Sequence, residues 1–504
     1  MATRTLFTIL NHKTKTLTAN AILARTRTYC FKSNPVKRNN LHSRINSIGD
    51  PSCSVAPVLQ QWVKEGKNVN EFQLQPIIRD LRARRRYSHA LEVSKWMSSS
   101  DLKFSSSDCA VQLDLIGRVH GLRSAENFFC SMKDQDKTVQ TYGALLNCYV
   151  REGLIDESLS LMKKMREMGF LSSPLNYNNL MCLYTNVGQL EKVPDVLLEM
   201  KMNGVSPDMF SYRICINSYG ARADYNSMEK VLQEMESQQN IEMDWGTYSV
   251  VANHYIKAGL NEKALHYLKE CEKKVGKNAL GYDHLISMYA SLGNLDEMKL
   301  LWGLLKAKCK KHTNINYIRM LGSLMKLGEL EESEKLLKKW ESSCKTYDFR
   351  VPNVLLIGYC QKGLVEKAEA VLQDIIKRRK TALPNSWSIV AAGYVNKNNI
   401  EKAFECFREA LALQAENKDW RPKASLISSI LSWLGDNGEV EDAEAFVKLL
   451  RTKVPANRDM YHALLKAYIR NGKEVEGLLE RMKDDEIGDI EETMKILSLR
   501  EQRS

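Results

Sequence analysis

Cysteine and histidine are the residues of this chain that could bind a metal or serve as nucleophile and base. The twelve cysteines never form Cys-x-x-Cys, and none of the nine histidines begins a His-x-Glu motif. Zinc sites are typically built on such short spacings. Cys148, Cys182 and Cys215 fall inside predicted helices, where a small apolar side chain packs well. We therefore expect no metal and no other cofactor.

Two further catalytic patterns are missing from the sequence. No Gly-x-x-x-x-Gly-Lys loop is present to cradle phosphates, and no Gly-x-Ser-x-Gly elbow is present to expose a nucleophile. The sequence therefore predicts a protein that is not an enzyme and has no small-molecule substrate.

The elements that recur along the chain are pairs of amphipathic helices, and residues 174–208 show the pattern best. Tyr177, Leu180 and Tyr184 lie at helical spacing and share one face of a first helix. Gly188 interrupts the pattern. A second apolar face then follows, formed by Leu190, Val193, Leu197 and Met200. Pro194 lies inside this second helix, so we expect a late helix start or a kink there.

The same pattern begins again at intervals close to 35 residues, with one interval of 40 after Pro384. The predicted repeat units begin near Val139, Pro174, Met209, Trp245, Ala279, Asn314, Phe349, Pro384, Ala424 and Arg458. Two weaker units precede them, near 71–106 and 107–138. A fixed period of this length is typical of a solenoid, and we expect the recurring aromatic residues to lie in its core.

This repeat resembles the pentatricopeptide repeat in its P-type form, the family of plant organelles. The resemblance covers about residues 71–482 and includes the Tyr177-Asn178 start and the Gly-x-x-Pro-Asp end from Gly204 to Asp208. The tetratricopeptide repeat, with 34 residues and its own Trp-Leu-Gly-Tyr pattern, fits less well. The resemblance implies an all-α fold, a right-handed α-solenoid or superhelix of stacked helix-turn-helix units.

The N-terminal segment has the composition of an organellar targeting sequence. Residues 1–49 contain nine Lys or Arg and no Asp or Glu. Arg27-Thr28-Tyr29 resembles a mitochondrial processing site with a cut after Tyr29. We predict a mitochondrial transit peptide over residues 1–50 and location in the matrix, which the composition favours over a plastid. The alternative is a disordered basic tail.

This segment also accounts for most of the net positive charge of the chain. The whole chain carries a formal charge of +12, and removing the nine charges of residues 1–49 leaves +3. The repeat array is therefore almost neutral, and the basic pI is no independent evidence for nucleic acid. No apolar run is long enough to span a bilayer, so we expect no membrane insertion.

The remaining chain divides by its repeat pattern. Residues 51–70 are predicted to be a connector with one short helical stretch. Residues 71–482 form an array of about twelve repeats, best defined over 139–482. Residues 483–504 form a charged tail, in which a capping helix would suit the end of a solenoid.

The resemblance also implies which residues contact RNA. In this family one base is read by the residue after the first helix's aromatic and by the last residue of the unit. Asn178 and Asp208 resemble such a pair for uridine. Leu175 and Phe210, the second residues of successive units, would clamp the ring. The other interpretation is that Asn178 and Asp208 are turn and cap residues.

Other units match this pattern less well. Ser249 with Asn278, and Ser428 with Asn457, loosely resemble adenine-reading pairs. The resemblance also implies that a basic residue near the end of the first helix meets the RNA backbone, and Lys257 and Lys326 hold that place. Five arginines at 79, 82, 84, 85 and 86 either bind phosphates or form a solvated helix end.

Two functions follow from these observations. The first is a mitochondrial single-stranded RNA-binding protein that acts in RNA processing, stability, splicing or translation. The alternative is a scaffold that binds other proteins, including a protein associated with the mitochondrial ribosome. The almost neutral array and the incomplete set of base-reading pairs favour the alternative, and the repeat with its leader favours the first.

Overall fold

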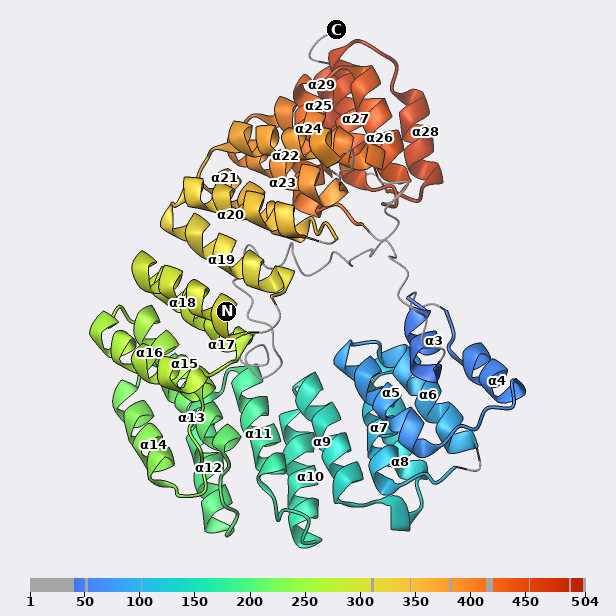
Figure 1. The fold of residues 1–504 in the computed structure, drawn as a ribbon. Coiled ribbons are helices and arrows are strands. Elements are labelled where there is room, and N and C mark those ends of the chain that lie inside the picture. The colour runs from blue at the N-terminus through green and yellow to red at the C-terminus, as the bar shows by residue number, and fades with distance from the viewer. Residues whose placement is uncertain are drawn as a thin grey trace. The chain divides into compact units, whose positions relative to one another are not determined.

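The computed structural model consists of helices, and no strand is present among the residues that it describes (Figure 1). The described residues are 40–49, 53–100, 102–309, 312–344, 346–379, 383–413, 420–452, 454–488 and 491–501. They divide into two compact parts, an N-terminal body that ends at Gly276 and a C-terminal body that begins at Lys277. Among these residues, every helix is too short or too polar to cross a lipid bilayer.

The N-terminal body contains the helices up to α16. They are α3 (Leu41–Ser47), α4 (Ala56–Lys64), α5 (Glu71–Ala83), α6 (Tyr87–Ser99), α7 (Ser106–Val119), α8 (Leu122–Ser131), α9 (Val139–Glu152), α10 (Ile155–Glu167), α11 (Pro174–Val187), α12 (Val193–Met202), α13 (Met209–Ala221), α14 (Tyr225–Ser237), α15 (Trp245–Lys257) and α16 (Asn261–Val275). Two 3-10 turns, Asp134–Asp136 and Leu190–Lys192, lie between them.

The C-terminal body contains the helices from α17 onward. They are α17 (Ala279–Ser291), α18 (Leu295–Lys308), α19 (Asn314–Leu327), α20 (Leu330–Ser343), α21 (Arg350–Gln361), α22 (Val365–Arg379), α23 (Pro384–Asn396), α24 (Ile400–Ala412), α25 (Ala424–Asn437), α26 (Val440–Arg451), α27 (Arg458–Arg470), α28 (Glu476–Asp484) and α29 (Glu491–Glu501).

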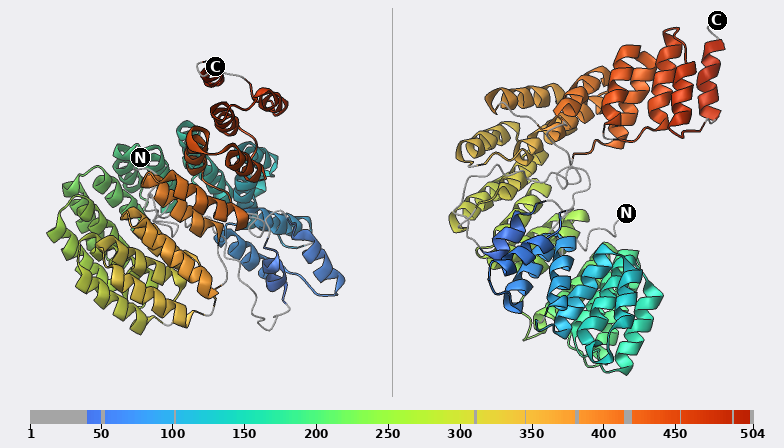
Figure 2. Two further views of the ribbon diagram at one scale, coloured as in Figure 1. Left: turned by 90° about the horizontal axis from the view of Figure 1, so that it is seen from above. Right: turned by 90° about the vertical axis from the view of Figure 1, so that its right-hand side faces the viewer.

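The helices alternate between two roles within each repeat unit. We call the first helix of a unit helix A and the second helix B. From Val139 onward, each helix A begins at the residue that the sequence predicts, except that α21 begins at Arg350, one residue after Phe349. In each body a helix A packs on its own helix B and on the next helix A, and Figure 2 shows this side-by-side stacking. The all-α solenoid architecture is confirmed.

The core of each unit is built as the repeat predicts. The helix A aromatics Tyr142, Tyr177, Tyr212, Tyr248, Tyr282, Trp387 and Tyr461 are buried, and the equivalent Tyr317 is half-buried. The small residues five places after the interhelical glycine are also fully covered: Ser158, Ala264, Ala368 and Ala443. A larger side chain there would separate the two helices, because the interior is close-packed.

The turn inside each unit depends on local backbone chemistry. Gly153, Gly188 and Gly328 end their helices at φ of 81°, 86° and 89°, a left-handed conformation that costs glycine little. Pro194 has the predicted effect, because α12 begins late, at Val193. The proline therefore lies in the first turn, where its missing N–H costs nothing.

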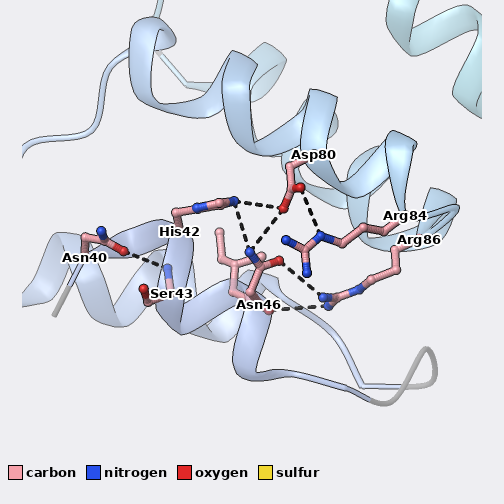
Figure 3. Close-up of polar contacts among 8 residues, drawn as sticks. Asn40, His42, Ser43, Asn46, Asp80, Arg84 and Arg86 are labelled. Carbon is pink, nitrogen blue, oxygen red and sulfur yellow. Dashed lines mark hydrogen bonds and ion pairs between the residues drawn. The ribbon is translucent and has the colours of Figure 1, made fainter. Parts of the chain in front are cut away.

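A helix within the predicted leader packs on the array at the N-terminal end (Figure 3). Leu41 and Ile45 of α3 are buried. His42 Nε2 and Asn46 Nδ2 lie 3.0 and 3.2 Å from Asp80 Oδ2, and Arg86 Nη2 donates to the Ile48 carbonyl at 2.5 Å. Removal of a leader stays a prediction. It would leave this packing intact only if the chain is cut before Asn40.

The C-terminal end is closed by one more helix. Helix α29 packs on α27 in the way that successive A helices pack, and Ile496 is buried. His462 Nε2 lies 3.0 Å from Thr493 Oγ1, and both side chains are shielded from solvent. The segment predicted as a charged tail thus includes a helix in the position of a cap.

Candidate nucleic-acid interface

Asn178 and Asp208 lie together at the junction of two consecutive A helices. The Nδ2 of Asn178, on α11, donates to Asp208 Oδ1 at 3.1 Å. Only 3% of Asn178 is exposed, and its Oδ1 is buried without a partner among the described residues. A buried carbonyl oxygen without a hydrogen bond costs about 1–3 kcal/mol. The amide therefore has unused hydrogen-bonding capacity beside an exposed carboxylate.

Asp208 is also the N-cap of α13. Its Oδ1 accepts from the Ser211 backbone N–H at 2.7 Å and from the Ser211 hydroxyl at 2.9 Å. The structure thus confirms that Asp208 is a helix cap. It does not exclude base contact, because a carboxylate has about four lone-pair sites and Asp208 is exposed.

Apolar side chains stand beside this pair in the first turns of α11 and α13. Leu175 is 63% exposed, although a leucine in these helices would ordinarily face the core. Phe210 is half-buried. The two residues fall at the same place in consecutive units, so a flat ring could contact both. That they clamp a base stays a prediction.

The two looser pairs differ from the first. Asn278 caps α17 and accepts from the backbone N–H groups of Leu280 and Gly281, whereas Ser249 is buried in the other body. Asn457 caps α27 and accepts from the Met460 N–H at 3.1 Å.

The hydroxyl of Ser428 donates to Asp459 at 3.0 Å, not to Asn457. Caps and local bonds account for Asn278, Ser428 and Asn457. Base reading by either pair remains an untested prediction.

The two lysines predicted to meet the RNA backbone are both exposed near the ends of their A helices. Lys326 Nζ donates to Ser291 Oγ at 2.8 Å, across to the preceding helix A. Lys257 ends α15. Either ammonium group is accessible to an anion.

A link between units recurs that the sequence analysis missed. The fifth residue of one repeat unit bonds to the third residue of α19, α23 or α29: Asp283 with Asn316, Asn353 with Ser386, and His462 with Thr493. The polar residue at the third position of the following helix is the feature of the sequence that could have revealed this link. Since the fifth side chain is occupied in these units, it is less available to a base than Asn178, whose oxygen is unpartnered.

Asp283 is the most perturbed of these linking residues. It is 3% exposed, and Asn316 Nδ2 donates to both of its oxygens at 3.0 Å. Burial raises the pKa of the Asp283 carboxyl to about 6, against the hydrogen bond from Asn316, which lowers it. A carboxylate here would disfavour a nearby phosphate, because like charges repel.

Three arginines from consecutive A helices converge on one buried carboxylate in the N-terminal body. Asp114 Oδ2 lies 3.1 Å from Arg82 Nη2, and its Oδ1 lies 3.0 Å from Arg118 Nε and 3.3 Å from Arg151 Nη1. The Asp114 side chain is 5% exposed, and the arginines are 25–37% exposed. Glu152 Oε1 lies 3.7 Å from Arg151 Nε, so the three guanidinium groups face two carboxylates and keep an excess of one positive charge.

Gly117 makes room for this arginine cluster. A Cβ at position 117 would lie 2.7 Å from Cys148 Sγ and 2.8 Å from Arg151 Nη2. Because position 117 of α7 has no side chain, the Arg151 guanidinium of α9 can occupy that space. The cluster is fixed in place by packing as well as by charge.

The arginine run at 79–86 is mostly engaged within the protein. Besides Arg82, Arg84 Nε donates to Asp80 at 2.9 Å, and Arg86 bonds His89 and carbonyls of α3. These arginines stabilise the end of the array. In the described part of the chain, no group of three His, Cys, Asp or Glu side chains could hold a metal ion.

Comparison with known proteins agrees with the repeat register. Family models described as the PPR repeat family and the PPR repeat match residues 174–221, and residues 140–170, 246–274, 351–379 and 386–412. A pentatricopeptide repeat-containing protein of Arabidopsis thaliana, named as mitochondrial, is 48% identical over 96% of this chain and 98% of its own length. A second, also named as mitochondrial, is 35% identical over 82% and 84%.

Among solved structures, the pentatricopeptide repeat protein PPR10 in complex with an 18-nt psaJ RNA element is similar at 15% identity and a TM-score of 0.44. The match covers 91% of this chain and 79% of that one. The relatives that align along nearly the whole sequence, together with the helix pairs that recur in register, show that this chain belongs to the pentatricopeptide repeat family.

Proposed function

We propose that this protein binds single-stranded RNA in mitochondria and acts in organellar RNA processing, stability, splicing or translation. It would act by occupying a transcript segment, without chemistry of its own. Occupancy of this kind blocks nucleases or holds a hairpin open. The family, in which a relative of known structure is named as an RNA complex, supports the proposal.

The observation that carries the proposal is the Asn178–Asp208 pair. The buried Asn178 oxygen lacks a partner, and the exposed Asp208 carboxylate lies 3.1 Å from the same amide. A base edge that donates to Asn178 Oδ1 would satisfy that oxygen after a small shift of the side chain. Leu175 offers an exposed apolar surface for the ring, and stacking on such surfaces tolerates any base.

The arginine cluster on Asp114 supports a path for the RNA backbone. Its guanidinium groups are held in fixed positions by a buried carboxylate, so little entropy is lost when they contact a phosphate. An array with a formal charge of only +3 needs such local concentrations of charge. The mitochondrial location rests on the basic, acid-free leader and on relatives named as mitochondrial.

Crosslinking in intact plant cells, followed by immunoprecipitation and sequencing, tests this function. We expect enrichment of one or a few mitochondrial transcripts, narrowed to short footprints. Recovery of no transcript above an untagged control contradicts the proposal. Stable co-migration with mitochondrial ribosomal subunits after a high-salt wash, without such footprints, points instead to a ribosome-associated scaffold.

A further inference from the structure

The unit that begins at Pro384 departs from the repeat, since 40 residues separate it from the next unit at Ala424. The last residues of this insertion, Trp420 to Lys423, line a pocket together with residues of α21 and α23. Helix α25, which follows, packs closely on α27 and only sparingly on α23. Trp420 to Lys423 thus lie where consecutive A helices pack only sparingly on each other.

The pocket is small, and its lining is more apolar than polar. Its volume is about 160 Å³, well below the roughly 300–1,000 Å³ of sites for drug-sized ligands. Its polar lining comes from α21, α23 and the insertion: Gln361, Asn385, Ser388, Asn396, Trp420, Arg421 and Lys423. A single planar heterocycle is the kind of ligand that suits this size and this mixture of amides with one aromatic ring.

One atom of the lining lacks a hydrogen-bond partner. The Nδ2 of Asn385 is buried, and among the described residues nothing accepts its protons. Ser388 donates its own proton to the Pro384 carbonyl at 2.9 Å, so its oxygen remains an acceptor. The pocket therefore offers a donor and an acceptor to a ligand.

Trp420 also packs against an aromatic residue that does not line the pocket. Its ring lies 6.2 Å from the ring of Phe407, a fully buried residue of α24. The residue that would clamp a base at this place in the next unit is Ser425, which is exposed and too small for stacking. The insertion thus supplies an aromatic wall that the repeat itself lacks.

The charge of the pocket favours a ligand that carries phosphate. Arg421 and Lys423 lie at its edge, and no acidic residue is among the described residues that line it. We propose that the pocket holds one unpaired base of a bound RNA, with Trp420 against the ring, Asn385 donating to the base, and Arg421 and Lys423 beside its phosphate. This inference rests on the proposed function.

The test uses RNA that the full-length protein itself enriches from a random-sequence pool. Binding is measured by fluorescence anisotropy for the wild type, Trp420→Ala, Trp420→Phe and Asn385→Leu. Trp420→Ala should weaken binding roughly 5- to 150-fold, the range for loss of one base–aromatic stack, and Trp420→Phe should restore most of it. Asn385→Leu keeps the side-chain volume and should also weaken binding, because the donor is lost.

Lys423→Ala and Lys402→Ala form a matched pair of charge changes. Lys402 lies on helix B of the same unit and pairs with Glu405, so only Lys423→Ala should reduce affinity. Melting curves check that each variant folds. If Trp420→Ala fails to fold, ultraviolet crosslinking of the wild type decides, with a nucleotide adduct expected on the peptide that contains Trp420.

The outcomes separate this inference from the function. If the pool yields no enriched RNA, the proposed function fails. If RNA binds but Asn385→Leu and folded Trp420 variants bind it as the wild type does, and no adduct forms at Trp420, the pocket does not hold a base. The inference is also overturned if free AMP competes with the RNA and no RNA adduct forms on the peptide that contains Trp420.

Discussion

Tyr255 of α15 donates its phenol proton to the carboxylate of Glu229 on α14, in the preceding repeat unit. Lys263 Nζ lies 2.9 Å from the same carboxylate and 5.4 Å from the centre of the Tyr255 ring. Tyr359, Glu334 and Lys367 repeat this arrangement in the C-terminal body. Stacked units are thus joined by a partly buried polar contact as well as by apolar packing.

Tyr255→Phe should destabilise the N-terminal body by about 1.5–3 kcal/mol, since a hydrogen bond to a charged group is lost. Faster hydrogen exchange in α14 and α15 is the expected signal. Tyr184→Phe is the matched control, because Leu159 takes the place of the glutamate in the unit before it. Equal effects of the two changes would show that the phenol contact contributes nothing specific.

His254 gives the N-terminal body a dependence on acid pH. Burial lowers its pKa to about 4, and its Nε2 lies 3.0 Å from Asn217 Oδ1. Because the unfolded chain binds a proton more readily, stability should be complete above about pH 6.5 and fall as the pH decreases toward 4.

The lowering of the His254 pKa from 6.5 to about 4 corresponds to at most about 3–4 kcal/mol of stability, at about 1.36 kcal/mol per pH unit. Thermal melting of the wild type and His254→Gln between pH 4 and 7 measures it. The slope should be smaller in the variant, which keeps an amide donor for Asn217. If the melting temperatures of the wild type and the variant change equally with pH, groups other than His254 cause the acid sensitivity.

Asp283 acts in the opposite direction in the C-terminal body. Its pKa is raised to about 6, so the folded state retains a proton that the unfolded chain has already lost. Stability should therefore fall as the pH rises from about 4 to 6 and stay constant above that. Asp283→Asn should raise the melting temperature at pH 7.5 and remove this slope, because a neutral amide oxygen still accepts from Asn316.

The arrangement of the helices could be predicted from the sequence, because the signals are local. Apolar spacing, glycine ends and caps placed the start of α11 at Pro174 and of α13 at Met209. The family resemblance paired Asn178 with Asp208 as base-reading residues, and the structure adds that the two side chains contact each other directly.

Contacts that depend on how two helices approach were not predictable in this way. The bond between Asp283 and Asn316 and the approach of Arg82 and Arg151 to Asp114 join side chains from different units. The residues from Trp420 to Lys423 follow extra sequence that the other units lack, so no periodic signal placed them at a pocket.

Asn178→Ala should weaken binding of the enriched RNA by about 1–3 kcal/mol if this amide reads a stacked base. Asp208→Asn separates base contact from capping, since asparagine is as good an N-cap and still accepts from Ser211. We expect a nearly unchanged melting temperature and a changed affinity. If both variants bind RNA as the wild type does, Asn178 and Asp208 are structural residues only.

The packing of α3 predicts where a leader would be removed. A cut after Tyr29 leaves Leu41 and Ile45 in the core and keeps Asn46 and Arg86 in contact. A cut at residue 50 would expose apolar surface worth about 1.5–3 kcal/mol for each buried side chain. N-terminal sequencing of the protein recovered from isolated mitochondria should therefore find a mature end before Asn40, and Ile45→Ala should lower its melting temperature. A mature end beyond Ile48 would contradict both the leader boundary and the role of α3 as part of the folded array.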